Sequence, residues 1–279
     1  RFRVPGGTMS LKPIQNLALH CIAERKGLVG PQAVGSGKTL VSLLAMEACG
    51  ARRAILLVPP TMQIPLRRDM VGYAKHFRMP DDWVRSLRDK EAGFWIVPYS
   101  RLSVASSTRL LEELRPDLLI CDEAHLVRDP KSARTKRLIR WFRQFPATRL
   151  VALSGTLTNR GLRDYAHLCE LSLREGSPLP TEEADLIAWA NCIDSRGEAQ
   201  DKDWSIFAAF SDLRGISDDE ERRNAAREVF RQRFVSTPGV VATTEASVQC
   251  SVLFHERKVS VPRAVQEAIA ELHKTWCRP

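Results

Sequence analysis

The chain has 279 residues, and its 42 Lys and Arg against 33 Asp and Glu give a formal net charge of +9. With 44% hydrophobic and 27% charged residues it has the composition of a globular protein, which excludes a disordered, collagenous or coiled-coil chain. No apolar run has the length of a membrane helix or the form of a signal peptide, and the seven cysteines include no CxxC pair that would indicate a zinc site. We therefore expect an intracellular protein in a reducing compartment, either the cytoplasm and nucleoid or the nucleus.

Residues 1–9 are predicted to be an N-terminal tail, because Met9 begins a plausible sequence of its own. Beyond it, short apolar and β-branched runs alternate with helical stretches, which predicts βαβ units and a parallel sheet. The runs are apolar throughout, so helices should cover both faces of the sheet. We predict an α/β domain over residues 10–175, with strands at residues 28–29, 54–58, 94–97, 118–121 and 150–153.

A glycine-rich loop follows the first predicted strand and leads directly into the apolar helical stretch 40–49. Its sequence, QAVGSGKT over residues 32–39, is typical of a phosphate-binding loop, although Gln32 stands in place of the usual first glycine. In this strand-turn-helix setting, the loop amides and the positive end of the helix would face a phosphate cluster, which disfavours a chance match. Lys38 would reach the β- and γ-phosphates of ATP, and the Thr39 hydroxyl would hold Mg²⁺. The loop residues predicted to bind ATP are Gly35, Ser36, Gly37, Lys38 and Thr39.

Two adjacent carboxylates, Asp122 and Glu123, follow the fourth predicted strand in the sequence DEAH. Ligand sites of α/β sheets lie at the carboxyl ends of the strands. We predict that Asp122 holds Mg²⁺ through its hydration shell and that Glu123 orients and deprotonates the attacking water. Catalysis is therefore assigned to Lys38, Asp122 and Glu123; an ordinary acidic loop is the alternative, which the phosphate loop upstream disfavours.

The fifth predicted strand ends in the sequence SGT, at Ser154, Gly155 and Thr156. Its two hydroxyls can hydrogen-bond with the acidic motif, so this turn is predicted to report the state of the nucleotide to the rest of the molecule. His125 is a candidate for the link between the two motifs, and a simple surface histidine is the alternative.

Charge is distributed unevenly along the chain. Residues 128–149 contain eight basic residues and one acidic residue, whereas residues 181–221 contain twelve acidic and three basic residues. The basic stripe is a candidate for binding nucleic acid, with a solvated helix face as the alternative. The apolar residues within this stripe are predicted to face the core rather than to stack on bases: Leu138, Ile139, Trp141 and Phe142.

A cluster of helix breakers, Gly176, Pro178 and Pro180, marks the predicted end of the α/β domain. Residues 176–279 are predicted to form a smaller, helix-rich segment. Within it, Ser217–Glu220 has the pattern of a capping box that opens a helix running to about Phe234, and Pro262 is predicted to open a final helix.

Taken in order, QAVGSGKT, DEAH and SGT resemble motifs one, two and three of the superfamily-two helicases, and further stretches resemble the Swi/Snf-type translocases of that group. LKPIQ at residues 11–15 is similar to the family's LRPYQ, which implies that Gln15 reads adenine. LVPPT at residues 57–61 and IVPYS at residues 96–100 resemble two strands whose turns face nucleic acid in that family. This implies nucleic-acid contacts from Pro59, Thr61, Tyr99 and Ser100.

The resemblance covers residues 11 to about 175 and implies a RecA-like P-loop NTPase lobe. Three positions after the phosphate loop depart from the family pattern: Leu66 replaces a tryptophan of motif Ia, Leu157 replaces the proline of motif three, and the asparagine that follows it, Asn159, comes one place early. Enzymes of this family close the ATP site with a second RecA-like lobe that carries arginine fingers, and no such pattern occurs before Pro279. The resemblance therefore implies that residues 176–279 lead toward a second lobe, and that this chain alone binds ATP but hydrolyses it poorly.

Together these features predict the first lobe of an ATP-hydrolysing motor on nucleic acid, in which the resemblance favours DNA, and duplex DNA in particular, over RNA. The second lobe would come from the same chain or from a partner chain. The alternative, from another functional class, is an ATP-gated switch or protein-docking module that does not translocate, with the acidic region 181–221 as its docking surface. A P-loop kinase or transporter ATPase is disfavoured, because neither accounts for Gln15, DEAH and SGT together.

Overall fold

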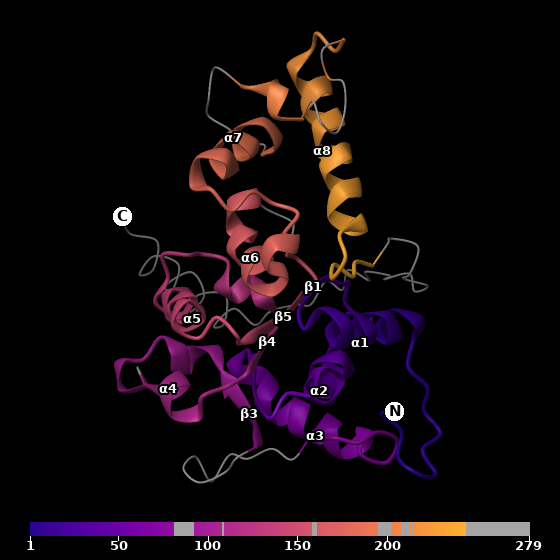
Figure 1. Ribbon diagram of the computed structural model, residues 1–279. Coiled ribbons are helices and arrows are strands. Elements are labelled where there is room, and N and C mark those ends of the chain that lie inside the picture. Colours follow the sequence, from indigo (N-terminus) through magenta and orange to yellow (C-terminus); the bar gives the residue numbers. More distant parts are fainter. Residues whose placement is uncertain are drawn as a thin grey trace, which may run out of the picture. The chain divides into compact units, whose positions relative to one another are not determined.

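A five-stranded, fully parallel sheet forms the centre of the computed structural model, with helices on both of its faces (Figure 1). The spatial order of the strands is β1-β5-β4-β2-β3. All five predicted strands are confirmed, each with one or two more residues than expected. Their bounds are β1 Leu28–Pro31, β2 Arg53–Val58, β3 Gly93–Pro98, β4 Leu118–Asp122 and β5 Arg149–Ser154.

The structure describes residues 1–80, 92–107, 109–157, 161–194, 202–207, 213 and 215–243, which all belong to one compact unit, Arg1–Ser247. The predicted final helix that begins near Pro262 lies outside the described residues. The boundary predicted near residue 175 stays a prediction.

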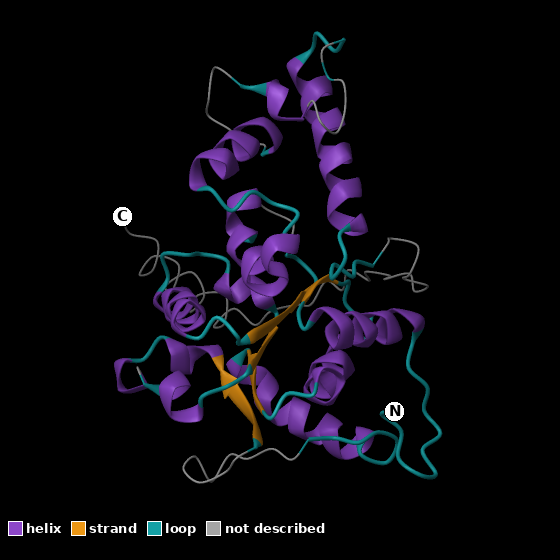
Figure 2. Ribbon diagram, in the orientation of Figure 1, coloured by secondary structure: helices purple, strands orange, loops and turns teal. Residues whose placement is uncertain are grey.

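Successive side chains of each strand point to opposite faces of the sheet, so the core consists of two apolar clusters, one on each face. In β2, Leu56 belongs to one cluster, whereas Ile55 and Leu57 belong to the other. The first cluster packs under α1 (Pro13–Arg25), α2 (Lys38–Cys49) and α3 (Gln63–Tyr73). The second packs under α4 (Leu110–Leu114), α5 (Ala133–Gln144) and α6 (Ala166–Leu173) (Figure 2). Coverage of both faces explains why the strands are apolar throughout.

Five of the eight basic residues of the stripe lie on α5, whose apolar residues face inward as predicted. Leu138, Trp141 and Phe142 are at most 3% exposed, while Ile139 is half-buried. Basic residues between them, such as Lys136 and Arg140, are exposed. The helix is therefore amphipathic, with a basic outer face.

After α6 the chain forms α7 (Glu183–Ile193) and α8 (Asp219–Ser236). Aromatic rings pack the two helices together. Trp189 of α7 contacts Phe207 and also Phe230 of α8, and Phe230 in turn contacts Phe234 near the end of α8. The predicted capping box is wrong by one residue. The N-cap of α8 is Asp218, whose carboxylate accepts the backbone N–H of Glu221 at 2.8 Å.

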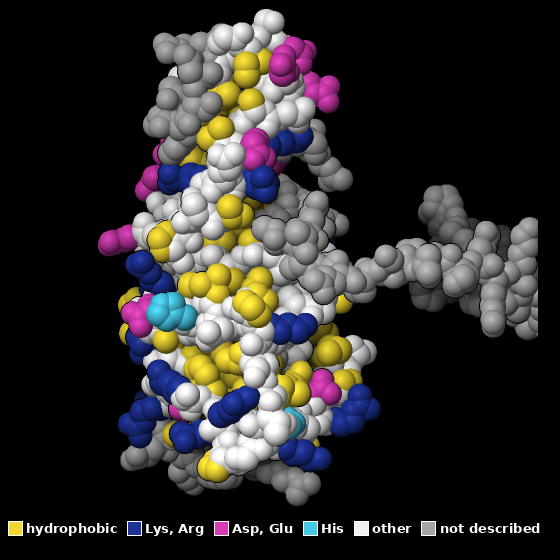
Figure 3. Space-filling model, turned by 90° about the vertical axis from the view of Figure 1, so that its right-hand side faces the viewer, with side chains coloured by type: hydrophobic (Ala, Val, Ile, Leu, Met, Phe, Trp, Pro, Cys, Tyr) yellow, Lys and Arg dark blue, Asp and Glu magenta, His cyan; other side chains and the backbone are white. Residues whose placement is uncertain are grey.

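Acidic side chains gather where α8 begins, and Lys and Arg side chains lie below them on the face that Figure 3 shows. The N-terminal residues lie against the segment that follows α3. The backbone N–H of Val4 donates to the carbonyl oxygen of His76 at 3.1 Å, and that of Arg78 donates to the carbonyl oxygen of Phe2 at 2.8 Å. Among the described residues, no helix combines the length and apolar character needed to cross a membrane.

Candidate nucleotide and catalytic site

The predicted phosphate loop connects β1 to α2 at the carboxyl edge of the sheet, and its backbone is built by two glycines. Gly35 and Gly37 have φ of 82° and 89°, angles that side chains with a Cβ rarely adopt. Gly37 caps α2, so Lys38 and Thr39 form the first turn of that helix. The hydroxyl of Ser36 is buried and has no hydrogen-bond partner among the described residues. A buried orphan hydroxyl beside a helix N-terminus fits a loop that binds the oxygens of a phosphate chain.

Lys38 is held inside this loop. Its side chain is 8% exposed, and its ammonium donates to the carbonyl oxygens of Gln32 at 2.9 Å and Ala33 at 3.2 Å. The predicted SGT turn lies close to the Lys38 ammonium. A Cβ placed on Gly155 would be 3.7 Å from Lys38 Nζ, at van der Waals contact. The backbone N–H of Gln32 also donates to the carbonyl oxygen of Ser154. The phosphate loop and the SGT turn therefore form one unit.

Gln15, the predicted adenine reader, bridges α1 to the phosphate loop. Its side chain is 5% exposed; Oε1 accepts the backbone N–H of Lys12 at 2.8 Å, and Nε2 donates to the carbonyl oxygen of Gly37 at 3.0 Å. Both ends of the amide contact protein backbone, so adenine recognition by Gln15 stays a prediction.

Lys12 is a residue that the sequence analysis did not single out. Its exposed ammonium donates to the carbonyl oxygen of Gly35 at 2.8 Å, at the tip of the phosphate loop. The only signal in the sequence was its place three residues before Gln15, at the start of α1. Lys12 adds a positive charge to the loop that is predicted to hold phosphates.

Asp122 ends β4 and lies within electrostatic reach of Lys38. Its side chain is 6% exposed. Burial raises the pKa of the Asp122 carboxyl to about 6, the charge of Glu123 adds to the rise, and Lys38 opposes it. A buried carboxylate at the end of β4 and a hydroxyl in the first turn of α2, Thr39, are oxygen donors of the kind that suits Mg²⁺.

Glu123 stands in a strained backbone conformation, with φ of 54° in the left-handed region. This turn ends β4 and begins the 3₁₀ segment Ala124–Val127. Glu123 Oε2 lies 3.2 Å from His125 Nδ1 and 3.5 Å from Ser154 Oγ, and these last two atoms are 3.0 Å apart. Ser154 Oγ also accepts the backbone N–H of Thr156 at 3.2 Å. The structure thus brings together His125, Glu123 and the SGT turn in one network, whose role in coupling stays a prediction.

The predicted nucleic-acid residues lie at the carboxyl ends of β2 and β3, which are adjacent because Val58 pairs with Pro98. Pro59 is half-buried, and Thr61 and Ser100 are exposed. The Tyr99 side chain is 1% exposed and its hydroxyl donates to the carbonyl oxygen of Asp122 at 2.8 Å, so its nucleic-acid contact stays a prediction that the buried side chain does not support. This hydrogen bond joins the end of β3 to the end of β4.

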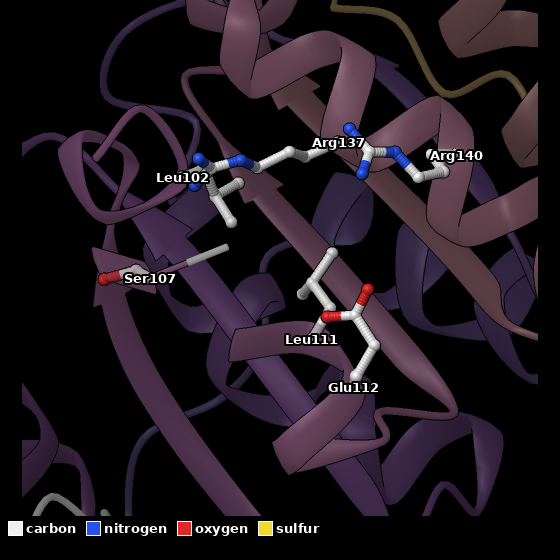
Figure 4. Close-up of a pocket in the computed structure, with 6 residues that line it drawn as sticks. All are labelled: Leu102, Ser107, Leu111, Glu112, Arg137 and Arg140. Atoms are coloured by element: carbon white, nitrogen blue, oxygen red, sulfur yellow. The ribbon is translucent and has the colours of Figure 1, made fainter. Parts of the chain in front are cut away.

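Two hollows lie away from this site. The pocket in Figure 4 has a volume of about 10 Å³, which is room for one water molecule. It is lined by residues from the loop after β3, from α4 and from α5: Leu102, Ser107, Leu111, Glu112, Arg137 and Arg140. A larger groove of about 570 Å³ lies between the ends of α5 and α6 and the segment 174–181. Neither includes the phosphate loop or the DEAH residues.

The model of the family described as type III restriction enzyme, res subunit, matches residues 8–159. That range includes Gln15, the phosphate loop, DEAH and SGT, together with all five strands. No curated protein matches the chain. Because the match spans more than half of its residues and the sheet is the parallel one of RecA-like domains, the chain belongs to the type III restriction enzyme res subunit family and is a helicase-like ATPase domain of superfamily two.

Proposed function

We propose that this chain is the ATP-binding lobe of a nucleic-acid-dependent translocase, of the Swi/Snf-like kind, that acts on duplex DNA. The observation that carries the proposal is the grouping of Lys38, Asp122 and Glu123 with the SGT turn around one phosphate loop. A nucleotide-binding module without hydrolysis has no need of Glu123 beside Asp122, whereas an ATPase uses such a residue on its attacking water.

In this proposal the site divides its work among the chain's own residues. The amides of residues 35–39 and the Lys38 ammonium hold the phosphates, while Gln15 orients the base. Thr39 and Asp122 hold Mg²⁺, which when bound neutralises charge that develops on the phosphates. Glu123 orients the attacking water and accepts its proton. His125 and Ser154 then connect Glu123 to the SGT turn, so that loss of the γ-phosphate changes a hydrogen-bonded network.

Nucleic acid would lie along the carboxyl ends of β2 and β3 and onto the adjoining basic face of α5. Thr61 and Ser100 are exposed there, and Arg101 follows Ser100 directly. From α5, Arg137 donates to the carbonyl oxygen of Val104 at 2.9 Å, which joins the basic helix to this loop. Exposed hydroxyls and cations on one edge suit phosphate contacts, which carry affinity without sequence preference.

Turnover is expected to be slow in this chain alone, because an arginine finger accounts for about 10³- to 10⁵-fold of the rate in related NTPases. The finger would come from a second RecA-like lobe in the same protein or from a partner chain.

The test is ATP hydrolysis with and without duplex DNA, single-stranded DNA and RNA, measured on the protein together with its second lobe, as the wild type and as Glu123→Gln. The proposal expects duplex DNA to increase turnover by the wild type and Glu123→Gln to remain inactive with every polymer. Hydrolysis that no nucleic acid changes would reject a motor and favour the ATP-gated switch. Turnover by Glu123→Gln at the wild-type rate would reject the assignment of the base.

A further inference from the structure

The segment that follows α8 runs beside β1 and adds a short parallel pairing to the sheet. The backbone N–H of Val29 donates to the carbonyl oxygen of Gly239 at 3.0 Å, and that of Val241 donates to the carbonyl oxygen of Val29 at 3.0 Å. The N–H of Thr243 then donates to the carbonyl oxygen of Pro31 at 3.2 Å. Because Pro31 ends β1, this pairing leads the chain from α8 to the start of the phosphate loop.

The side chain of Thr243 completes this path. Its hydroxyl oxygen accepts the backbone N–H of Ala33, the second residue of the phosphate loop, at 2.7 Å. The carbonyl oxygen of that same Ala33 accepts from the ammonium of Lys38 at 3.2 Å. Two consecutive hydrogen bonds therefore connect a residue beyond α8 with the lysine that is predicted to bind the phosphates.

The geometry that brings Thr243 to the loop is specific. At the end of α8, the Thr237 hydroxyl donates to the carbonyl oxygen of Arg233 at 2.8 Å. Gly239 then turns the chain with φ of 95°, where any Cβ would collide with Leu173 of α6. Val240 and Val241 are 7% and 2% exposed and insert into the two core clusters, one on each face of the sheet. Packing of these two valines therefore holds the segment in the position from which the Thr243 hydroxyl contacts Ala33.

We propose that Thr243 is a positioning residue of the phosphate loop, and that ATP binding and the docking of residues 239–243 on β1 stabilise each other. The inference rests on the proposed binding of ATP at this loop. Without the hydroxyl, the Ala33 N–H loses its acceptor and the carbonyl that holds Lys38 is less well placed. By thermodynamic reciprocity, a nucleotide that prefers the ordered loop also strengthens the pairing beside β1. The docking of residues 239–243 on β1 thereby depends on whether the nucleotide is bound.

The test compares Thr243→Val, which removes the acceptor at nearly constant volume, with Thr243→Ser, which keeps it. Thr237→Val is the matched control, because it removes a threonine hydroxyl from the same exit segment but not from the loop. The dissociation constant of a fluorescent ATP analogue with Mg²⁺ should rise about 5- to 10-fold in Thr243→Val, within the range of typical couplings. It should change less than about 2-fold in Thr243→Ser and Thr237→Val.

Hydrogen exchange supplies a second measurement that a merely structural role would not change. In the wild type, ATP should slow exchange of the Val241 and Thr243 amides, and in Thr243→Val this protection by ATP should disappear. Wild-type affinity in Thr243→Val, or an equal loss of affinity in Thr237→Val, would overturn the inference and leave the proposed function intact. A wild-type chain that binds no ATP would overturn both.

Discussion

At Asp122, burial opposes the predicted role of the side chain as a cation ligand. Its carboxyl is 6% exposed beside a second carboxylate, which suits a cation ligand and disfavours the ionised form when no cation is present. The folded chain therefore binds a proton at Asp122 more tightly than the unfolded chain does. Its contribution to stability must fall as the pH rises from the unfolded pKa of 3.8 through the folded pKa of about 6.

We predict that Asp122→Asn changes the pH dependence of folding of the metal-free protein. A rise in the pKa of Asp122 from 3.8 to about 6 lowers the free energy of unfolding of the wild type by about 3 kcal/mol at pH 8, where the carboxyl is ionised. At pH 4 the same rise lowers it very little. The free energy of unfolding of Asp122→Asn, relative to the wild type, should therefore increase across that interval. Urea titrations at several pH values with EDTA present would measure this difference. A difference that stays constant from pH 4 to pH 8 would show that Asp122 titrates normally.

At the scale of elements, the phosphate loop depends on its two glycines in different ways. Both have positive φ, so alanine at either position strains the backbone by about 1–2 kcal/mol. At Gly35 the added methyl group meets open space, whereas at Gly37 it collides with the amide of Gln15. The second substitution therefore also separates α1 from the loop, because Gln15 must release the carbonyl oxygen of Gly37.

Gly37→Ala should consequently destabilise the chain more than Gly35→Ala does, and it should reduce ATP affinity more strongly. Thermal unfolding and nucleotide titration of the two variants side by side would measure both effects. Equal losses in the two variants would show that the Gln15 bridge contributes nothing beyond backbone strain.

The strands and the loop could be predicted from the sequence because their signals are local. A run that is buried on both faces is apolar throughout, and a phosphate loop needs its glycines and lysine at fixed spacing. The cap of α8 was displaced by one residue because Ser217, Asp218 and Asp219 are all acceptable N-caps.

Tyr99 and Thr243 show what local patterns leave out. A tyrosine after a strand end reads as exposed, yet its hydroxyl finds a buried acceptor in the carbonyl of Asp122, 23 residues away. The partner of Thr243 is 210 residues away in the sequence, and Lys12 meets Gly35 only because α1 packs beside α2. Such contacts follow from tertiary packing, which no period or motif encodes.

For the molecule as a whole, the distribution of charge and the fold both favour binding of nucleic acid. Arg137 of the basic helix α5 contacts the loop after β3, whereas acidic residues gather where α8 begins. A net charge of +9 favours phosphate binding that weakens as salt increases. Family membership adds a helicase-like ATPase domain, and the Thr243 contact gives that domain a route from its phosphate loop to the chain beyond α8.

The most direct test of the central claim is equilibrium binding of Mg²⁺-ATP to three proteins: the wild type, Lys38→Ala and Glu123→Gln. Lys38 is assigned to the phosphates and Glu123 to the attacking water, so the wild type and Glu123→Gln should bind with similar affinity while Lys38→Ala loses nearly all binding. Comparable affinity in Lys38→Ala and the wild type would contradict the account, because it would place the nucleotide elsewhere than at the phosphate loop.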